Sequence, residues 1–409
     1  MHILFLTPRF YPVLGGHENY VYQLAKSLEN AGNIVSVFTT DALDLEHFWV
    51  EGRHSLQAGR ETHDGIEIHR FPICHRRWRR RAGRLLGLLP DWRLKAQFAR
   101  PSFRVIGLRD ALRHAPADVI HVSPLPYNQL LYYGIREARR RGIRVVTTPC
   151  THFGEEFNDE VSRYYTQKFQ IDMLNHCDTV LALTESEQER LTRLGVHRQK
   201  IVVGGAGINP EEVTGGDAEA FRAKYRINDP IVLHFGMKAY EKGSVCVVEA
   251  MKALWQAGSQ AWLVMAGPSL RAFDNYLQPQ LSQVNRLLNL DVVSEQEKQD
   301  VLAAASIVVQ PSRVESLGLV CLEAWANGKP VIAADIAVMR ELIEPERDGL
   351  LVPFDRPSEL AAAIQRLLSN GRECQTMGRS GQQKVYEKFA WKAALQRIHP
   401  FFVGNGAKS

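Results

Sequence analysis

Residues 308–334 read V-V-Q-P-S-R-V-E-S-L-G-L-V-C-L-E-A-W-A-N-G-K-P-V-I-A-A and carry the most informative pattern of the chain. Short apolar strands are predicted at both ends of this stretch, and a helix opens after Gly318. Glu315 and Glu323 bracket the helix start, with seven residues between them. A helix start presents free backbone N–H groups and attracts phosphate, and a glycine there lets the backbone approach a ligand closely. The stretch therefore predicts a site for a charged, phosphorylated ligand at the carboxyl edge of a sheet.

Length and composition are those of an ordinary globular protein. The chain has 409 residues, of which 45% are hydrophobic and 23% charged, so two or three domains are expected. No apolar run approaches the roughly 18 residues that cross a membrane, and residues 2–7 suit a buried strand better than a signal peptide. The six cysteines are scattered without a C-x-x-C pair, which predicts reduced, structural thiols in a cytosolic protein.

Positive charge is concentrated in one segment. Eleven basic residues and a single acid, Asp91, lie between Arg70 and Arg104, whereas the rest of the chain is slightly acidic. Arginines from Arg76 to Arg84, followed by leucines and a tryptophan, suit an interfacial element on an anionic membrane. A solvated crossover between strands is an equally good interpretation. A nucleic-acid site is less favoured, because no recognised binding module accompanies the arginines.

Predicted strands and helices alternate along the chain. Strands are predicted at 2–7, 34–39, 66–71, 119–122, 144–148, 179–183, 201–203, 231–235, 262–266, 307–310 and 331–334. Helical patterns lie between them at 19–31, 127–141, 186–194, 245–257, 295–304 and 358–368. Alternation of this kind predicts parallel sheets covered by helices, and a break near 204–229 divides them into two doubly wound domains. Ligands of such sheets bind beyond the carboxyl ends of the strands, so the site is expected in a cleft between the domains.

Two further loops suit a phosphorylated ligand. Gly15 and Gly16 precede a predicted helix, although such glycine pairs are commonly plain turns. The strand at 231–235 leads into a loop with Lys238 and Lys242, which could neutralise a diphosphate or be ordinary surface lysines. The G-x-G-x-x-G pattern of dinucleotide-binding proteins does not occur at either loop, so a nicotinamide enzyme is disfavoured.

Taken in order, these motifs resemble the family-4 retaining glycosyltransferases of the GT-B fold, almost from end to end. The matching motifs are Gly15-Gly16-x-Glu18, Thr184-Glu-Ser-Glu187, Lys242-Gly243, Pro311-Ser312, the glutamate pair Glu315 and Glu323, Gly328-Lys-Pro-Val-Ile-Ala, and Tyr386-Glu-Lys-Phe-Ala-Trp391. The resemblance implies two Rossmann-like domains. Residues 1–205 would form an acceptor-binding domain, joined by a helix at about 391–409 that crosses back onto it, and residues 206–390 would bind the nucleotide sugar.

The resemblance also implies roles for single residues. Glu323 would bind the nucleotide ribose, Glu315 would lie against the transferred sugar, Lys242 would neutralise the diphosphate, and His152 would lie near the reacting sugar. Glu315, His152 and Lys242 are therefore the candidate catalytic residues. The candidate substrate-binding residues are Gly15, Gly16, Lys238, Lys242, Glu315, Ser316, Leu317, Gly318, Leu319 and Glu323. The family commonly has arginine at the position of Met237, and Lys238 could replace its charge but not its bidentate fork.

The expected reaction is transfer of a sugar from a nucleoside-diphosphate sugar to an acceptor hydroxyl. A UDP-sugar is favoured as donor over a GDP-sugar, and the acceptor could be a glycan, a glycolipid or a small molecule. Lysines and helix N–H groups can stabilise the departing diphosphate, and no D-x-D triplet is present to hold a metal, so a cofactor-free, metal-independent mechanism is expected. Retention of configuration is implied by the resemblance alone. The alternative function is a GT-B protein that binds nucleotide sugars without transfer. A cytoplasmic location is expected, with peripheral attachment to the membrane as an open alternative.

Overall fold

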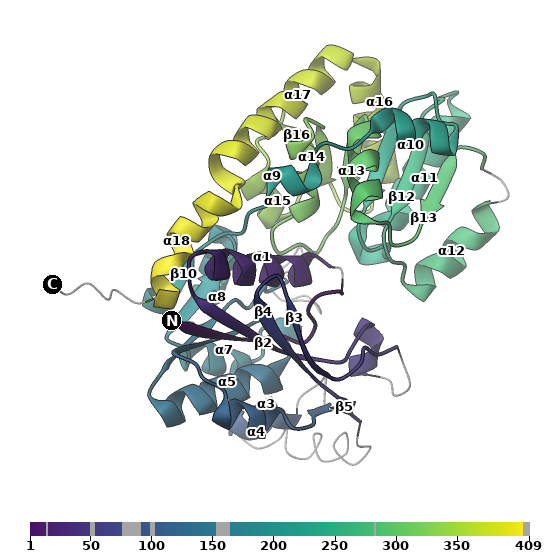
Figure 1. Cartoon of the computed structure of the whole chain (residues 1–409). Coiled ribbons are helices and arrows are strands. Elements are labelled where there is room, and N and C mark those ends of the chain that lie inside the picture. Colours follow the sequence, from purple (N-terminus) through teal and green to yellow (C-terminus); the bar gives the residue numbers. More distant parts are fainter. Residues whose placement is uncertain are drawn as a thin grey trace. The chain divides into compact units, whose positions relative to one another are not determined.

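The computed structural model describes residues 1–13, 15–49, 54–75, 91–98, 103–152, 164–281 and 284–403. Two compact units divide the chain, and Figure 1 shows helices flanking the sheet of each one. The first unit comprises Met1–Ala206 with the C-terminal segment from Ala394, and the second comprises Gly207–Ala393. The predicted fold class, α/β with a parallel sheet in each of two domains, is confirmed.

The sheet of the first unit has the strand order β10-β9-β8-β7-β1-β2-β4-β3, and every neighbouring pair is parallel except β3 with β4. Its strands are β1 (His2–Leu6), β2 (Ile34–Thr40), β3 (Gly59–His63), β4 (Ile66–Phe71), β7 (Val119–Val122), β8 (Arg144–Thr147), β9 (Thr179–Ala182) and β10 (Ile201–Val203); β5 (Ile73–Cys74) and β6 (Arg104–Val105) pair separately. The helices are α1 (Gly16–Asn30), η1 (Leu45–Phe48), α3 (Trp92–Phe98), α4 (Leu108–His114), α5 (Asn128–Arg141), α7 (Lys168–Asn175), α8 (Glu185–Arg193), η2 (Arg198–Lys200) and α18 (Trp391–Val403).

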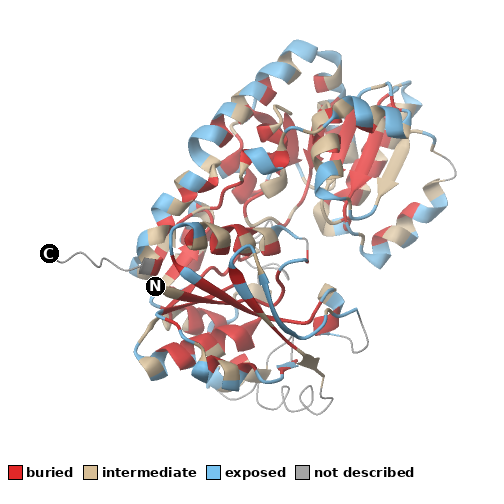
Figure 2. Ribbon diagram, in the orientation of Figure 1, coloured by how far each residue is buried: buried red, intermediate tan, exposed pale blue. Residues whose placement is uncertain are grey.

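The central strands of this sheet are buried on both faces. Ile3, Leu4, Phe5 and Leu6 of β1 are wholly inaccessible to solvent, and β7 is buried along its length (Figure 2). Parallel strands covered by helices on both sides require such continuous apolar runs, because neither face meets water. This requirement explains why the opening residues of the chain form a core strand.

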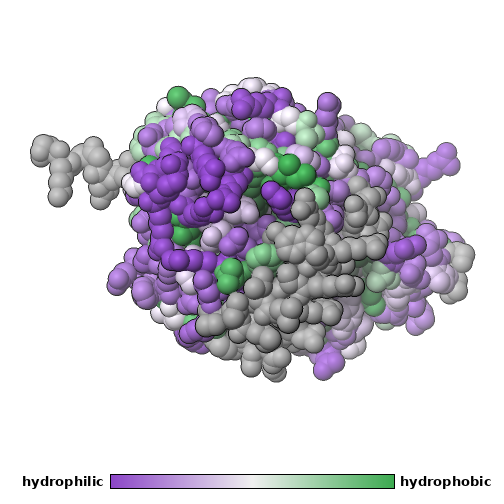
Figure 3. Space-filling view, turned by 90° about the horizontal axis from the view of Figure 1, so that it is seen from below, coloured by the Kyte–Doolittle hydropathy of each residue, from purple (hydrophilic) through white to green (hydrophobic). Residues whose placement is uncertain are grey.

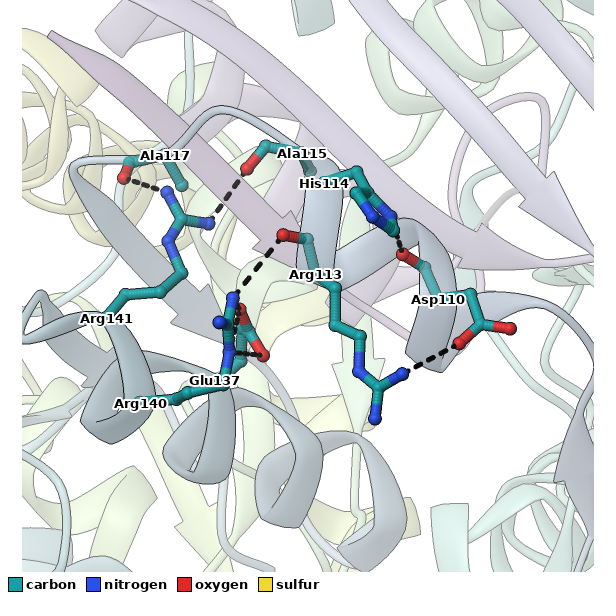
Figure 4. A network of polar contacts seen from close by, with 8 residues as sticks. All are labelled: Asp110, Arg113, His114, Ala115, Ala117, Glu137, Arg140 and Arg141. Atoms are coloured by element: carbon teal, nitrogen blue, oxygen red, sulfur yellow. Dashed lines mark hydrogen bonds and ion pairs between the residues drawn. The ribbon is translucent and has the colours of Figure 1, made fainter.

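The arginine-rich end of α5 stabilises the turn between α4 and β7 (Figure 4). Arg141 donates to the carbonyl oxygens of Ala115 at 2.8 Å and Ala117 at 2.7 Å. Arg140 pairs with Glu137 on the same helix at 2.7 Å. The guanidinium of Arg141 thus satisfies carbonyls that follow α4, and this basic helix end has a structural use.

The second unit contains a parallel sheet of order β13-β12-β11-β14-β15-β16. Its strands are β11 (Ile231–Phe235), β12 (Trp262–Ala266), β13 (Leu287–Leu290), β14 (Ile307–Gln310), β15 (Val331–Ala334) and β16 (Gly349–Val352). Its helices are α9 (Pro210–Val213), α10 (Ala218–Tyr225), η3 (Tyr240–Lys242), α11 (Ser244–Gln256), α12 (Arg271–Leu281), α13 (Glu295–Ala304), α14 (Leu319–Ala326), α15 (Ala337–Leu342), α16 (Pro357–Ser369), α17 (Gly371–Lys384) and the π-helical turn η4 (Val385–Phe389).

The last helix, α18, packs onto the first unit. Phe402 stacks on Phe5 of β1 with ring centroids 6.3 Å apart, and Arg144 of β8 donates to the carbonyl oxygen of Phe402 at 2.6 Å. At Gly204 an added Cβ would lie 2.3 Å from Ile398, so only a glycine leaves room for the helix there. The C-terminal helix therefore completes the core of the unit that contains the N-terminus.

One face of the described surface is mostly polar. Figure 3 shows a face that is largely hydrophilic, with hydrophobic atoms in small separate spots. Among the helices of the described residues, none has both the length and the apolar character that crossing a membrane requires.

Candidate functional site

The strand order of the second unit marks one edge of its sheet as a binding position. From β11 the chain proceeds outward through β12 to β13, and then returns to β14 on the other side of β11 and proceeds to β15 and β16. The strand order therefore reverses between β11 and β14, which pair directly in parallel. In open α/β sheets, ligands bind outside the carboxyl ends of the strands at such a switch point. The loops after Phe235 and Gln310, which contain most of the predicted site residues, both begin there.

Backbone contacts fix these two loops against each other. Gly243 has φ of 73°, and an added Cβ would lie 2.3 Å from the carbonyl oxygen of Pro311. The backbone N–H of Arg313 donates to the carbonyl oxygen of Glu241 at 3.1 Å, and the two side chains form an ion pair whose Nη2–Oε1 distance is 2.8 Å. Glycine at position 243 is thus required both by its left-handed backbone and by the close approach of the second loop.

A buried histidine on β11 links β14 to the start of α11, next to these loops. His234 on β11 has Nδ1 at 3.0 Å from the carbonyl oxygen of Val309 and Nε2 at 2.8 Å from Oγ of Ser244. Since a carbonyl can only accept, Nδ1 carries the proton and Nε2 accepts from Ser244. Ser244 in turn accepts the backbone N–H of Ala239 at 3.0 Å. Burial lowers the pKa of His234 to about 4, so the ring is neutral and serves as a structural link that the sequence did not predict.

Glu315 and Lys242 form an ion pair at the switch point. Nζ of Lys242 lies 2.8 Å from Oε1 of Glu315 and 2.8 Å from the carbonyl oxygen of Val314. Nε2 of Gln310, at the end of β14, donates to the same carboxylate oxygen at 3.0 Å. Burial alone would raise the pKa of Glu315, but the Lys242 charge and these hydrogen bonds outweigh burial and hold the pKa below its ordinary value. Glu315 is therefore an ionised, oriented carboxylate.

Glu323 forms a second, more deeply buried pair. Its side chain is 5% exposed, and Oε1 lies 2.7 Å from Nζ of Lys298 on α13. Lys298 also lies over the ring of Phe235 at 5.7 Å from the centroid, at the carboxyl end of β11. Although burial opposes its charge, the neighbouring Glu323 carboxylate raises the pKa of Lys298 above its ordinary value. Lys298 lies in a run of polar residues, 295–300, and its place in the site could not be expected from the sequence.

The helix start between the two glutamates has the predicted form. Gly318 caps α14 with φ of 90°, and an added Cβ would lie 2.6 Å from Cε of Met339. The N–H groups of Leu319 and Val320 precede the hydrogen-bonded ladder of the helix, which begins with the N–H of Cys321 bonding to the Gly318 carbonyl. Leu317 is buried, whereas Ser316 and Leu319 are partly exposed. The N-terminus of an eight-residue helix is thus placed between Glu315 and Glu323.

Lys238 is the predicted site residue whose placement differs from its expected role. Its side chain is completely buried, and Nζ donates to Oδ1 of Asn289 at 2.8 Å and to the carbonyl oxygen of Leu290 at 2.6 Å. Burial lowers the pKa of this ammonium group. Lys238 thereby ties the loop after β11 to β13, and its geometry does not support the phosphate contact that its position next to Met237 suggested.

The remaining predicted residues lie on the first unit. Gly16 begins α1, and Gly15 precedes it in extended backbone, where an added Cβ would lie 2.2 Å from Oε2 of Glu18. Glu18 is buried and pairs with Arg9 at 2.6 Å, so a small residue at position 15 leaves room for this ion pair. His152 follows β8, is partly buried and meets the ring of Tyr165 edge-on at 5.2 Å. A site shared between these residues and those of the second unit stays a prediction.

Comparisons with known proteins identify the family. Residues 15–207 match the family described as "Glycosyl transferase 4-like domain", and residues 217–384 match "Glycosyl transferases group 1". An uncharacterized glycosyltransferase of Methanocaldococcus jannaschii is 23% identical over 96% of this chain and 95% of its own length. The alpha-D-kanosaminyltransferase of Streptomyces kanamyceticus is 29% identical over 54% of this chain and 58% of its own length.

Solved structures of similar fold agree with these matches. HepE of Anabaena, determined with UDP and glucose, superposes with a TM-score of 0.73 at 21% identity over 98% of this chain and 99% of its own. Sucrose-phosphate synthase of Thermosynechococcus elongatus superposes with a TM-score of 0.75 at 21% identity over 98% of both chains. These likenesses show a fold that spans both units. The chain belongs to the family-4 glycosyltransferases of the GT-B fold, and is thus a transferase that acts with a nucleotide sugar.

Proposed function

We propose that this glycosyltransferase moves a sugar from a UDP-sugar to an acceptor hydroxyl, with retention of configuration and without a metal ion. The observation that carries the proposal is the pair of lysine-bound carboxylates, Glu315 and Glu323, on either side of the α14 N-terminus. HepE, of similar fold, was solved with UDP and with UDP-glucose, which favours UDP over other nucleotides.

The positive groups of this site match the charge that the reaction develops. Breaking the bond between the sugar and the diphosphate leaves negative charge on the diphosphate and positive character on the anomeric carbon. The N–H groups at the start of α14 and the ammonium of Lys242 can stabilise the departing diphosphate, because they are already oriented before the reaction. The Glu323 carboxylate can accept hydrogen bonds from ribose hydroxyls, and a charged acceptor strengthens such bonds.

The contacts of Glu315 favour a positioning role in the retaining reaction. A covalent sugar–enzyme intermediate needs a carboxylate that is free to attack the anomeric carbon. The Lys242 charge and the hydrogen bonds to Glu315 instead hold the pKa of its carboxylate below the ordinary value, which makes Glu315 a weaker base and a poorer nucleophile. We therefore propose attack on the same face of the sugar, with the leaving phosphate accepting the acceptor's proton and Glu315 orienting the sugar.

The first unit is proposed to bind the acceptor, with His152 beside the reacting sugar and Gly15 and Gly16 contributing backbone to the donor. The proposed membrane contact of Arg76–Arg84 lies outside the described residues. Serine substitutions of Arg76, Arg77, Arg79, Arg80 and Arg81 should abolish sedimentation with anionic vesicles. Wild-type protein that never sediments with such vesicles would exclude peripheral attachment, and with it the proposed location on the cytoplasmic membrane face.

A second candidate function is binding of nucleotide sugars without transfer. It is favoured by one observation, the burial of Lys238 beside Met237, which leaves the diphosphate site with fewer cations than the family pattern provides. Release of UDP from a UDP-sugar in the presence of acceptor sugars distinguishes the two functions, since a binding protein would release none.

A thermal-shift panel of UDP, GDP, ADP and their glucose conjugates tests the proposal directly. A ligand that binds only the folded protein raises the melting temperature, and a concentration 100 times the Kd stabilises by about 2.7 kcal/mol. UDP and a UDP-sugar are expected to raise the melting temperature of the chain, and GDP and ADP to raise it less. A panel in which no nucleoside diphosphate shifts the transition would contradict the proposed donor site.

A further inference from the structure

We infer that Lys298 on α13 is a positioning residue of the donor site, which orients the Glu323 carboxylate so that its second oxygen faces the ribose hydroxyls. The inference rests on the proposed function and names a residue of the same site for which neither the sequence motifs nor the family resemblance provides a role. Three observations support it: the geometry of the pair, its burial, and its place at the switch point.

The geometry leaves half of the carboxylate available. Oε1 of Glu323 accepts from Nζ of Lys298 at 2.7 Å, and no other described residue hydrogen-bonds to the carboxylate. A carboxylate can accept about four hydrogen bonds, so Oε2 retains its full capacity. The two hydroxyls of a ribose are donors that suit such an oxygen. Lys298 thus fixes one oxygen and leaves the other for a ligand.

Burial makes the lysine necessary. The side chains of Lys298 and Glu323 are 14% and 5% exposed, respectively. A buried charge without a partner carries a large desolvation penalty, so the two opposite charges stabilise each other at this depth. Lys298 supplies the counter-charge for the Glu323 carboxylate at a depth that little solvent reaches.

The pair lies at the edge of the sheet where the nucleotide is expected to bind, and not only in the core. Lys298 belongs to the first turns of α13 and lies over Phe235, the last residue of β11, while Glu323 belongs to α14, which follows β14. The pair therefore joins α13 to α14 beside the carboxyl end of β11, one of the two strands at the switch point. A neighbouring pair on the same helix offers a contrast: Glu297 binds Lys224 of α10 at 2.6 Å, and Lys224 is 60% exposed.

Calorimetric titration with UDP and with 2′,3′-dideoxy-UDP tests the inference. The wild-type chain should prefer UDP by about tenfold or more, because a hydrogen bond to a charged group is worth about 1.5–3 kcal/mol. The K298M variant should lose that preference through weaker UDP binding, with affinity for the dideoxy nucleotide unchanged. K298R should keep most of the preference. K224M, the matched control, removes the ion pair that Lys224 of α10 forms with Glu297 on α13, and should behave like wild type.

The outcomes separate the inference from the proposed function. If K298M binds UDP and dideoxy-UDP equally more weakly, Lys298 contacts the phosphates or only supports the fold. If K298M keeps the wild-type preference for UDP, Glu323 needs no partner. Either result overturns the inference but leaves the proposed donor site intact. Wild-type protein that binds neither nucleotide would overturn the proposed function and the inference together. If K298M does not fold, K298L, which also removes the donor, takes its place with the same expectation.

Discussion

The carboxyl edges of the two sheets each place a buried glutamate on the helix that follows a strand, and the two carboxylates are bound in different ways. Glu187 of the first unit accepts the backbone N–H of Thr151 through Oε1 and that of Leu183 through Oε2, both at 2.7 Å. Glu323 of the second unit is bound by Lys298 through Oε1 only. Both residues are nearly inaccessible to solvent, so burial alone does not distinguish a structural acid from a ligand-binding one. What distinguishes them is hydrogen-bonding: the described residues bind both carboxylate oxygens of Glu187 but only one of Glu323.

The largest expected effect is on stability, from substitution of Glu187, the structural glutamate of the two. Glu187→Ala removes two charge-assisted hydrogen bonds and leaves two backbone N–H groups that lost their acceptor, so the free energy of unfolding should fall by about 3 kcal/mol or more. Affinity for UDP should not change. Chemical denaturation and calorimetry measure the two quantities on one sample.

Glu189→Ala is the matched control, because Glu189 is on the same helix, is 68% exposed and forms only a loose pair with Arg193 at 3.4 Å. It should change stability by less than about 0.5 kcal/mol. A Glu187 variant as stable as wild type, or one that lost UDP affinity while still folded, would remove the distinction between the two carboxylates.

The next effect is on turnover in the second unit. Lys242→Ala should slow release of UDP from a UDP-sugar by about 10²-fold, the scale of a lost electrostatic contact to the transition state. It should also release Glu315 from its ion pair. Lys252→Ala, which removes a partly exposed intrahelical pair with Glu249 at 3.1 Å, serves as the control and should leave turnover unchanged. Turnover at the wild-type rate in the Lys242 variant would refute its role at the diphosphate.

Buried imidazoles give both units a similar sensitivity to acid. Burial lowers the pKa of His234 in the second unit to about 4, and that of His121 in the first unit to about 3. As pH falls below the ordinary value near 6.5, the unfolded chain takes up protons that the folded chain excludes, so stability falls. From these values, His234 alone should cost about 2 kcal/mol by pH 5.

His234→Gln should flatten the loss of stability of the second unit between pH 6.5 and pH 5 by about that amount, as followed by thermal unfolding across the range. His54→Gln provides the control, because His54 is 83% exposed and should leave the pH profile unchanged. A His234 variant with the wild-type slope would show that the imidazole is not held neutral in the fold.

The fold was largely predictable because the alternation of buried strands and amphipathic helices is visible as a pattern of apolar residues in the sequence. The edge strands β13 and β16 were not predicted. β13 is short and only partly buried, and β16 follows directly on a turn that ends at Asp348, so neither shows a strong run of apolar residues. A strand of this kind becomes visible only when its neighbour supplies the hydrogen bonds.

The site was predicted in part. The glutamate pair and the glycine-capped helix start could be expected from the sequence, since spacing and glycine conformation are local properties. The roles of the lysines could not be predicted in the same way, because they depend on contacts between distant segments. Lys238 follows a strand as a phosphate-binding lysine would, yet packing places its ammonium on Asn289 and Leu290. Lys298 lies in a polar helical run, and only the approach of α13 to α14 gives it a partner.

Calorimetric titration of UDP into the wild-type chain and into Glu323→Gln tests the central claim most directly, with Glu249→Gln, an acid on α11, as control. The account predicts that wild type and control bind UDP with equal affinity and that the Glu323 variant binds about tenfold or more weakly, through the loss of a charge-assisted hydrogen bond to the ribose. Equal affinity in all three proteins would contradict the assignment of the donor site to the α14 edge of the second unit.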